Sequence, residues 1–167
     1  MSRPDRLLPG TSADFVPPWR LRHHHVQSIY PSLPLRRAGV ERRAAGLRQS
    51  SRELLVDCGE GVRLLALAAR QVDAGRAPAD RVAILLHGWE GSADSLYLLS
   101  VGQLLFDAGY DVVRLHLRDH GDSHHLNPEM FHSCRIAEVV GAVRELQRQH
   151  AGQRLVLGGF SLGGNFC

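Results

Sequence analysis

A serine flanked by glycines near the end of the chain is the first candidate for chemistry. Gly159-Phe160-Ser161-Leu162-Gly163 has the form G-x-S-x-G and directly follows the apolar run LVL at 155–157. On a sharp strand-to-helix turn such a serine stands clear of the sheet and can act as a nucleophile. The two glycines leave room for the turn, and the backbone N–H of Leu162 can donate to an oxyanion. The alternative for a Gly-rich turn is a phosphate or dinucleotide site, which requires patterns that this turn lacks.

A second motif, His87-Gly88-Trp89-Glu90-Gly91, follows the apolar run VAILL at 82–86. A His-Gly loop in this place commonly supplies the second oxyanion donor, for which the N–H of Trp89 is our candidate. Gly88 lets the backbone fold towards the serine. We interpret His87 as a brace that holds the loop through hydrogen bonds, with a catalytic role as the alternative.

A third polar stretch, LRDHGDS at 117–123, follows the next apolar run. We interpret Arg118 and Asp119 as residues that brace the loop. His120 lies on the rim of the predicted site and could reach a substrate, although a histidine on a rim is more often structural or solvated. The triple histidine at 23–25 has no Cys or carboxylate beside it at ligand spacing, so neither a metal nor an organic cofactor is predicted.

The predicted elements bring these loops together. Runs at 53–57 and 62–68 indicate a β-hairpin, and runs at 81–87, 111–117 and 154–160 indicate three further strands. Helical spacing predicts helices from Asp94 or Ser95 to Gly109 and over 134–149. Alternating strands and helices predict an α/β fold with a mostly parallel sheet and flanking helices, and sites form at the carboxyl ends of such strands. Residues 1–52 are predicted to be an N-terminal arm with a short helix at 23–30, and 53–167 a single domain.

Composition excludes several classes of function. The net charge of +3, from 20 Lys+Arg and 17 Asp+Glu, gives no basic patch for nucleic acid. The start, MSRPDRLLPG, lacks the apolar core of a signal peptide, and no apolar run has the roughly 20 residues of a transmembrane helix. The three cysteines indicate no disulfide framework. We therefore expect a cytoplasmic location; the sequence does not indicate the oligomeric state.

Four stretches together resemble the α/β-hydrolase superfamily, and within it the YheT-like branch: VAILLHGWEGSADSLY, GYDVVRLHLRDHGDS, FHSCRIAEVVGAV and GGFSLGGN. The segment LRHHHVQSIYP at 21–31 resembles the opening of that branch, with His25 and Gln27 matching its H-x-Q motif. The resemblance implies a serine hydrolase that acts on carboxylic esters or related acyl bonds of small molecules.

The same resemblance places the catalytic acid and then the histidine base after the nucleophile in the chain. Six residues follow Ser161, and none of them is an acid or a histidine. We therefore expect the chain to be the N-terminal part of a longer enzyme, without the C-terminal strands and helices of the fold and inactive by itself. His120 with Asp119 or Asp122 is the best internal alternative for the base. A non-catalytic ligand-binding module on the same fold is the alternative function.

Overall fold

The computed structural model describes residues 16–30 and 34–167, and contacts divide the chain into two units, Met1–Ala38 and Gly39–Cys167. In the first unit, the 3-10 helix η2 (Trp19–Leu21) precedes α1 (His24–Ile29), which confirms the short helix predicted at 23–30. Residues 1–15 and 31–33 of the predicted arm lie outside the described residues, as does the start of the chain that was searched for a signal peptide.

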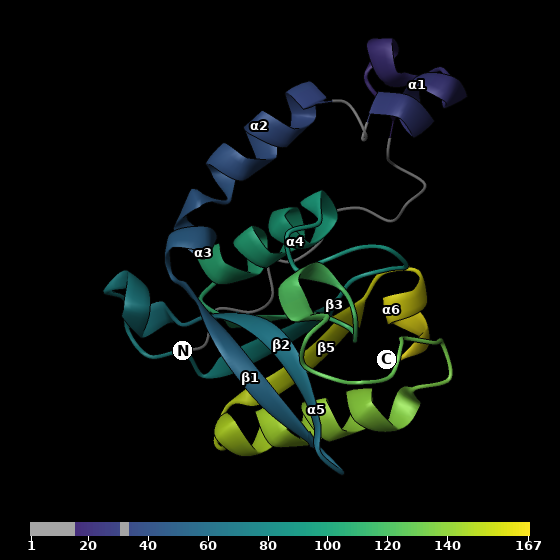
Figure 1. Cartoon of the computed structure of the whole chain (residues 1–167). Coiled ribbons are helices and arrows are strands. Elements are labelled where there is room, and N and C mark those ends of the chain that lie inside the picture. The colour runs from purple at the N-terminus through teal and green to yellow at the C-terminus, as the bar shows by residue number, and fades with distance from the viewer. Residues whose placement is uncertain (1–15, 31–33) are drawn as a thin grey trace. The chain divides into compact units, whose positions relative to one another are not determined.

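The second unit is built on a five-stranded sheet, shown in Figure 1. Its strands are β1 (Ser51–Gly59), β2 (Val62–Ala69), β3 (Arg81–Leu86), β4 (Asp111–Leu115) and β5 (Arg154–Gly159), in the order β1-β2-β4-β3-β5. β3 pairs in parallel with both β4 and β5, whereas β2 pairs antiparallel with β1 and with β4. The predicted α/β fold and leading hairpin are confirmed, and the antiparallel pairing of β2 with β4 makes the sheet mixed.

Helices cover both faces of this sheet. α4 (Leu96–Asp107) connects β3 to β4, α5 (Ile136–Gln149) connects β4 to β5, and the short α6 (Leu162–Asn165) follows β5. Side chains alternate between the faces along a strand, so Ile84 of β3 lies in the core cluster beneath α5, whereas Leu85 lies in the cluster beneath α4. This burial on both faces explains why β3 is almost entirely apolar. Two 3-10 helices, η4 (Gln71–Ala74) and η5 (Gly121–Ser123), lie in the connections.

Part of the predicted arm at 1–52 is helical, and its residues from Gly39 onward belong to the second unit. α2 (Pro34–Arg43) and α3 (Ala45–Gln49) precede β1, and Val40, Ala44 and Leu47 are buried in the cluster beneath α4. The backbone N–H of Leu47 donates to Oε1 of Gln103 on α4 at 3.0 Å. The spacing of these three apolar residues, i, i+4 and i+7, is helical, but it is short and set among arginines, which is why the sequence interpretation missed it.

None of the helices in the described ranges has the length and apolar character that crossing a membrane requires.

Candidate active site

Three loops leave the carboxyl ends of the parallel strands, and each holds one non-glycine residue in the left-handed region of φ. These residues are Glu90 after β3 (φ 52°), Asp119 after β4 (φ 58°) and Ser161 after β5 (φ 52°). This conformation costs free energy for a residue with a Cβ, and it persists where the surrounding contacts enforce it. Such residues cluster at functional sites, so the position of all three at one edge of the sheet marks that edge as the candidate site.

Ser161 lies at the tip of a turn between β5 and α6, with φ 52° and ψ −117°. A Cβ at Gly159 would come within 3.0 Å of the backbone of Gly163 and Gly164. A Cβ at Gly163 would come equally close to the carbonyl oxygens of Leu86 and His87 on β3 and its loop. Both glycines of the motif therefore permit a backbone approach that no other residue would allow.

The loop after β3 touches this turn directly. A Cβ built on Gly88 would lie 3.2 Å from Cβ of Ser161 and 3.1 Å from the carbonyl oxygen of Phe160. Within residues 16–30 and 34–167, the backbone N–H groups of Trp89 and Leu162 have no hydrogen-bond acceptor. The two predicted oxyanion donors are thus unpaired, and they sit on two loops that are in contact beside the serine hydroxyl.

Tyr97, in the first turn of α4, was not singled out from the sequence. Its hydroxyl oxygen accepts a hydrogen bond from the N–H of Gly88 at 3.0 Å, and its ring lies 4.8 Å from that of Phe160. The signal in the sequence is its place in the first turn of a helix that directly follows the Gly88-to-Gly91 loop. Such a position brings a side chain back towards the loop that precedes the helix.

His87 is fully buried and joins two of the loops. Its Nε2 accepts a hydrogen bond from the backbone N–H of Leu117 at 3.0 Å. That contact requires an unprotonated Nε2, so Nδ1 carries the proton and donates to the carbonyl oxygen of Gly88 at 2.7 Å. Burial, with a smaller contribution from the neighbouring His120 and His116, lowers the pKa of His87 to about 4. These two hydrogen bonds link the loop after β3 to the loop after β4, and the imidazole is neutral at physiological pH.

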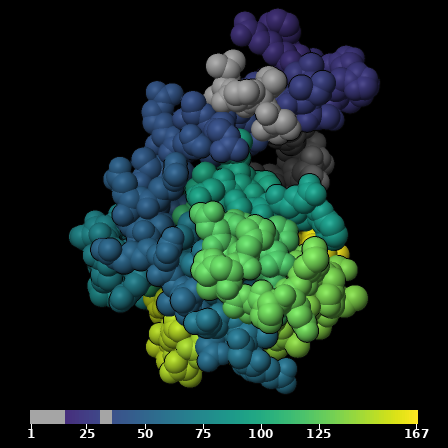
Figure 2. Space-filling model, viewed as in Figure 1, coloured from purple at the N-terminus to yellow at the C-terminus, as the bar shows by residue number. Residues whose placement is uncertain are grey.

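His120 lies in a row of rings on the rim of the site. Its ring is 4.8 Å from that of His87 and 5.0 Å from that of Phe131, which in turn lies 6.1 Å from the ring of Trp89. Trp89 is 63% exposed, so the row ends in an apolar surface open to solvent. Figure 2 shows the loop that carries His120 and Phe131, in green, at the surface of the molecule.

The internal alternative for a catalytic base is not assembled in the described part of the chain. Nδ1 of His120 lies 2.6 Å from the carbonyl oxygen of Arg118 rather than from a carboxylate. Oδ2 of Asp119 accepts from the backbone N–H of Phe131 at 2.6 Å, so this carboxylate braces its own loop. The side chain of Ser161 makes no capping hydrogen bond to α6, and within the described residues neither Asp119 nor Asp122 is hydrogen-bonded to His120.

A buried ion pair fixes the same loop to α5. Nε and Nη2 of Arg118 donate to Oε2 of Glu138 at 2.9 and 2.7 Å, and Nη1 donates to the carbonyl oxygen of Glu129 at 3.1 Å. Arg118 therefore acts as the loop brace inferred from the sequence, and Glu138 is its partner. No local pattern indicates that partner, because the pair spans 20 residues and forms only when α5 packs on the sheet.

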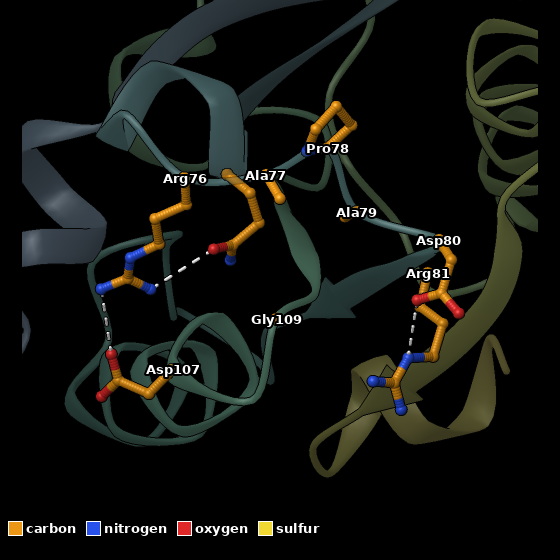
Figure 3. Close-up of a pocket in the computed structure, with 9 residues that line it drawn as sticks. Arg76, Ala77, Pro78, Ala79, Asp80, Arg81, Asp107 and Gly109 are labelled. Carbon is orange, nitrogen blue, oxygen red and sulfur yellow. Dashed lines mark hydrogen bonds and ion pairs between the residues drawn. The ribbon is translucent and has the colours of Figure 1, made fainter. Parts of the chain in front are cut away.

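A separate pocket of about 490 Å³ opens at the other end of the strands, where β3 begins, and is shown in Figure 3. There Arg76 donates to Gln71 and pairs with Asp107, while Arg81 pairs with Asp80. These polar groups bind one another, and the pocket lies away from Ser161. In the described ranges, no three His, Cys, Asp or Glu side chains gather closely enough to hold a metal ion.

Comparison with known proteins identifies one family. A family model described as the alpha/beta hydrolase fold matches residues 82–167, just over half of the chain. A search of curated proteins finds no match to the chain.

Solved structures with a similar fold include an esterase from Pyrococcus furiosus, Pf2001, with a TM-score of 0.59 and 20% identity over 74% of this chain and 45% of that one. An alpha-beta serine hydrolase homologue from Coxiella burnetii has a TM-score of 0.58 and 17% identity, and the match covers 69% of this chain and 54% of that one. XC6422 from Xanthomonas campestris, an a/b serine hydrolase without a lid, has a TM-score of 0.55 and 23% identity, and the match covers 70% of this chain and 53% of that one. The chain thus spans about half the length of these structures.

Proposed function

Because the chain belongs to the α/β-hydrolase fold family, we propose that the protein containing it hydrolyses carboxylic esters or related acyl bonds of small molecules, with Ser161 as the nucleophile. The observation that carries the proposal is the backbone of Ser161, held at φ 52° between β5 and α6 with the loop after β3 against its Cβ. A serine presented on such a turn has its hydroxyl clear of the sheet and near a helix N-terminus, as nucleophilic attack requires.

In the proposed mechanism Oγ of Ser161 attacks the carbonyl carbon of the substrate. The oxyanion that forms accepts hydrogen bonds from the N–H groups of Leu162 and Trp89, which are left unpaired in the described part of the chain. Donors aimed at the developing charge stabilise the transition state, and the loss of one typically costs on the order of 10²–10³ in rate. The collapse of the tetrahedral intermediate expels the alcohol and leaves an acyl-serine, which water then hydrolyses.

Attack by a serine hydroxyl at neutral pH also needs a general base. We place the base and its orienting acid in the half of the fold that the chain does not span in the solved structures. The 167-residue chain assayed alone is then expected to show no ester turnover. If it does hydrolyse p-nitrophenyl butyrate with saturation, His120 is the base to test first, because its loop borders the same edge of the sheet.

Two finer proposals rest on sequence. His25 and Gln27, which lie in α1, match the opening motif of the YheT-like branch and support assignment to it. A cytoplasmic location is proposed from the composition and the three free cysteines, with no role for nucleic acid or a cofactor.

Covalent labelling of the full-length protein by a fluorophosphonate probe, which reacts with nucleophilic serines, tests the proposed function. We expect covalent labelling of the peptide that contains Ser161, and its loss in Ser161→Ala. Ser133→Ala is the matched control, because Ser133 is an exposed serine on a neighbouring loop, and it should label normally. If the wild-type protein is folded but neither labels nor turns over esters, the enzyme proposal is refuted and the non-catalytic binding module takes its place.

A further inference from the structure

We propose that Tyr97 is a positioning residue that sets the separation between the two oxyanion donors, the N–H groups of Trp89 and Leu162. The inference rests on the proposed function and names a residue that neither the motifs nor the family match singles out. Tyr97 is the side chain that contacts both loops on which these donors sit.

The first contact holds the loop after β3. The hydroxyl oxygen of Tyr97 accepts the N–H of Gly88 at 3.0 Å, and the N–H of Gly91 donates to the carbonyl oxygen of Gly88 at 3.0 Å, which closes the turn. A Cβ on Gly91 would lie 2.6 Å from the hydroxyl oxygen of Tyr97, so glycine at this position is what lets the phenol approach. Trp89 lies within this turn, and its N–H shares a peptide plane with the carbonyl of Gly88, which Gly91 and His87 hold. Tyr97 holds the peptide unit before it through the N–H of Gly88, so it sets where this plane stands relative to the serine.

The second contact holds the turn that carries the nucleophile. The ring of Tyr97 packs on that of Phe160 with centroids 4.8 Å apart and planes tilted by 44°. The N–H of Phe160 donates to the carbonyl oxygen of Leu86 at 3.1 Å, and its own carbonyl oxygen accepts the N–H of Gly163 at 2.9 Å. Phe160 is therefore the anchor of the turn, and the contact with Tyr97 fixes the position of its side chain.

The position of the donors matters most when the oxyanion forms. Without the phenol oxygen, the N–H of Gly88 loses its acceptor, and the His87–Gly88 peptide can shift and carry the next peptide, with the N–H of Trp89, away from its place beside the serine. Substrate binding through the rim does not depend on these donors, so KM should stay the same. Loss of a whole donor costs on the order of 10²–10³ in rate, and misplacing one should cost less. We therefore expect kcat to fall by about 10-fold.

Two phenylalanine variants of the full-length protein provide the test. Tyr97→Phe removes only the hydroxyl, whereas Tyr110→Phe removes a buried hydroxyl that accepts from Nη1 of Arg81 at 3.2 Å, at the opposite end of the sheet. With p-nitrophenyl butyrate, Tyr97→Phe should lower kcat about 10-fold at unchanged KM. It should weaken inhibition by butylboronic acid, which forms a tetrahedral adduct with the serine, by a similar factor. Tyr110→Phe should keep wild-type kinetics.

The melting temperatures of both variants separate positioning from general stability. A similar small decrease in the two, with the kinetic defect confined to Tyr97→Phe, supports the inference. Equal kinetics in the two variants, or a change in KM with kcat preserved, would overturn it while leaving the proposed function intact. A wild-type protein without turnover or probe labelling would overturn both.

Discussion

The buried pair between Arg118 and Glu138 should be the most stabilising ion pair that holds the site, and Glu138→Ala tests this. The two side chains are only 3% and 6% exposed, so removal of the carboxylate leaves a cation buried without its partner. Breaking such a pair typically costs about 3–5 kcal/mol. Both contacts from Arg118 go to the single oxygen Oε2, and Nη1 retains the carbonyl oxygen of Glu129. We therefore expect the lower end, about 3 kcal/mol.

Urea unfolding followed by circular dichroism measures this loss. Glu145→Ala is the matched control, because Glu145 lies on the same helix and pairs with Arg148 at 2.7 Å, but at the exposed surface. Exposed pairs contribute little to stability, so the control should unfold near the wild-type midpoint. The double variant Arg118→Met/Glu138→Leu should recover much of the loss, since apolar residues can replace a buried pair. Equal midpoints for Glu138→Ala and Glu145→Ala would refute the reasoning.

Two further predictions concern the elbow and the buried histidine. Gly163→Ala should destabilise the fold strongly and abolish probe labelling, because the added Cβ would meet backbone atoms of Leu86 and His87. Gly164→Ala should be tolerated, because its Cβ would lie 3.4 Å from the nearest atom. The melting temperatures of the two variants test this difference. The pKa of His87 is lowered to about 4 from 6.5, so the unfolded state binds the extra proton between these values. The free energy of unfolding should therefore be highest above pH 6.5, fall by about 3 kcal/mol as the pH is lowered to 4, and stay constant below pH 4. In urea titrations across this range, His87→Asn should flatten the curve, and an unchanged slope would contradict the assignment.

The parts of the fold that depend on local pattern could be predicted from the sequence. β3 is a continuous apolar run because both its faces are covered, and α5 shows helical spacing because only one of its faces is. The turn at Ser161 was recognisable because glycine is required at both 159 and 163, the first by the turn's own backbone and the second by the approach of β3 and its loop. In each case the signal lies within a few consecutive residues, even where its cause is packing against another element.

The parts that were missed depend on contacts between distant segments. α3 is a five-residue helix that is stable because Leu47 is buried against α4, and a short helix has too few periodic positions to be read from sequence. The predicted strand at 111–117 ends as β4 at Leu115. The N–H of His116 still donates to the carbonyl oxygen of Leu65, and the N–H of Leu117 donates to His87. The role of Tyr97 likewise follows from two loops meeting in space.

The three strained loops depend on one another through His87. Its side chain donates to Gly88 in the first loop and accepts from Leu117 at the start of the second, while its carbonyl oxygen lies against Gly163 of the third. Each loop holds one non-glycine residue at positive φ, and a cost of that kind is sustained only when neighbours prevent relaxation. A buried neutral imidazole suits this position, because it can donate and accept at once without a charge that burial would penalise. The site is thus held as a single unit, and protonation of Nε2 would remove the acceptor of the Leu117 N–H and so break the link between the first two loops.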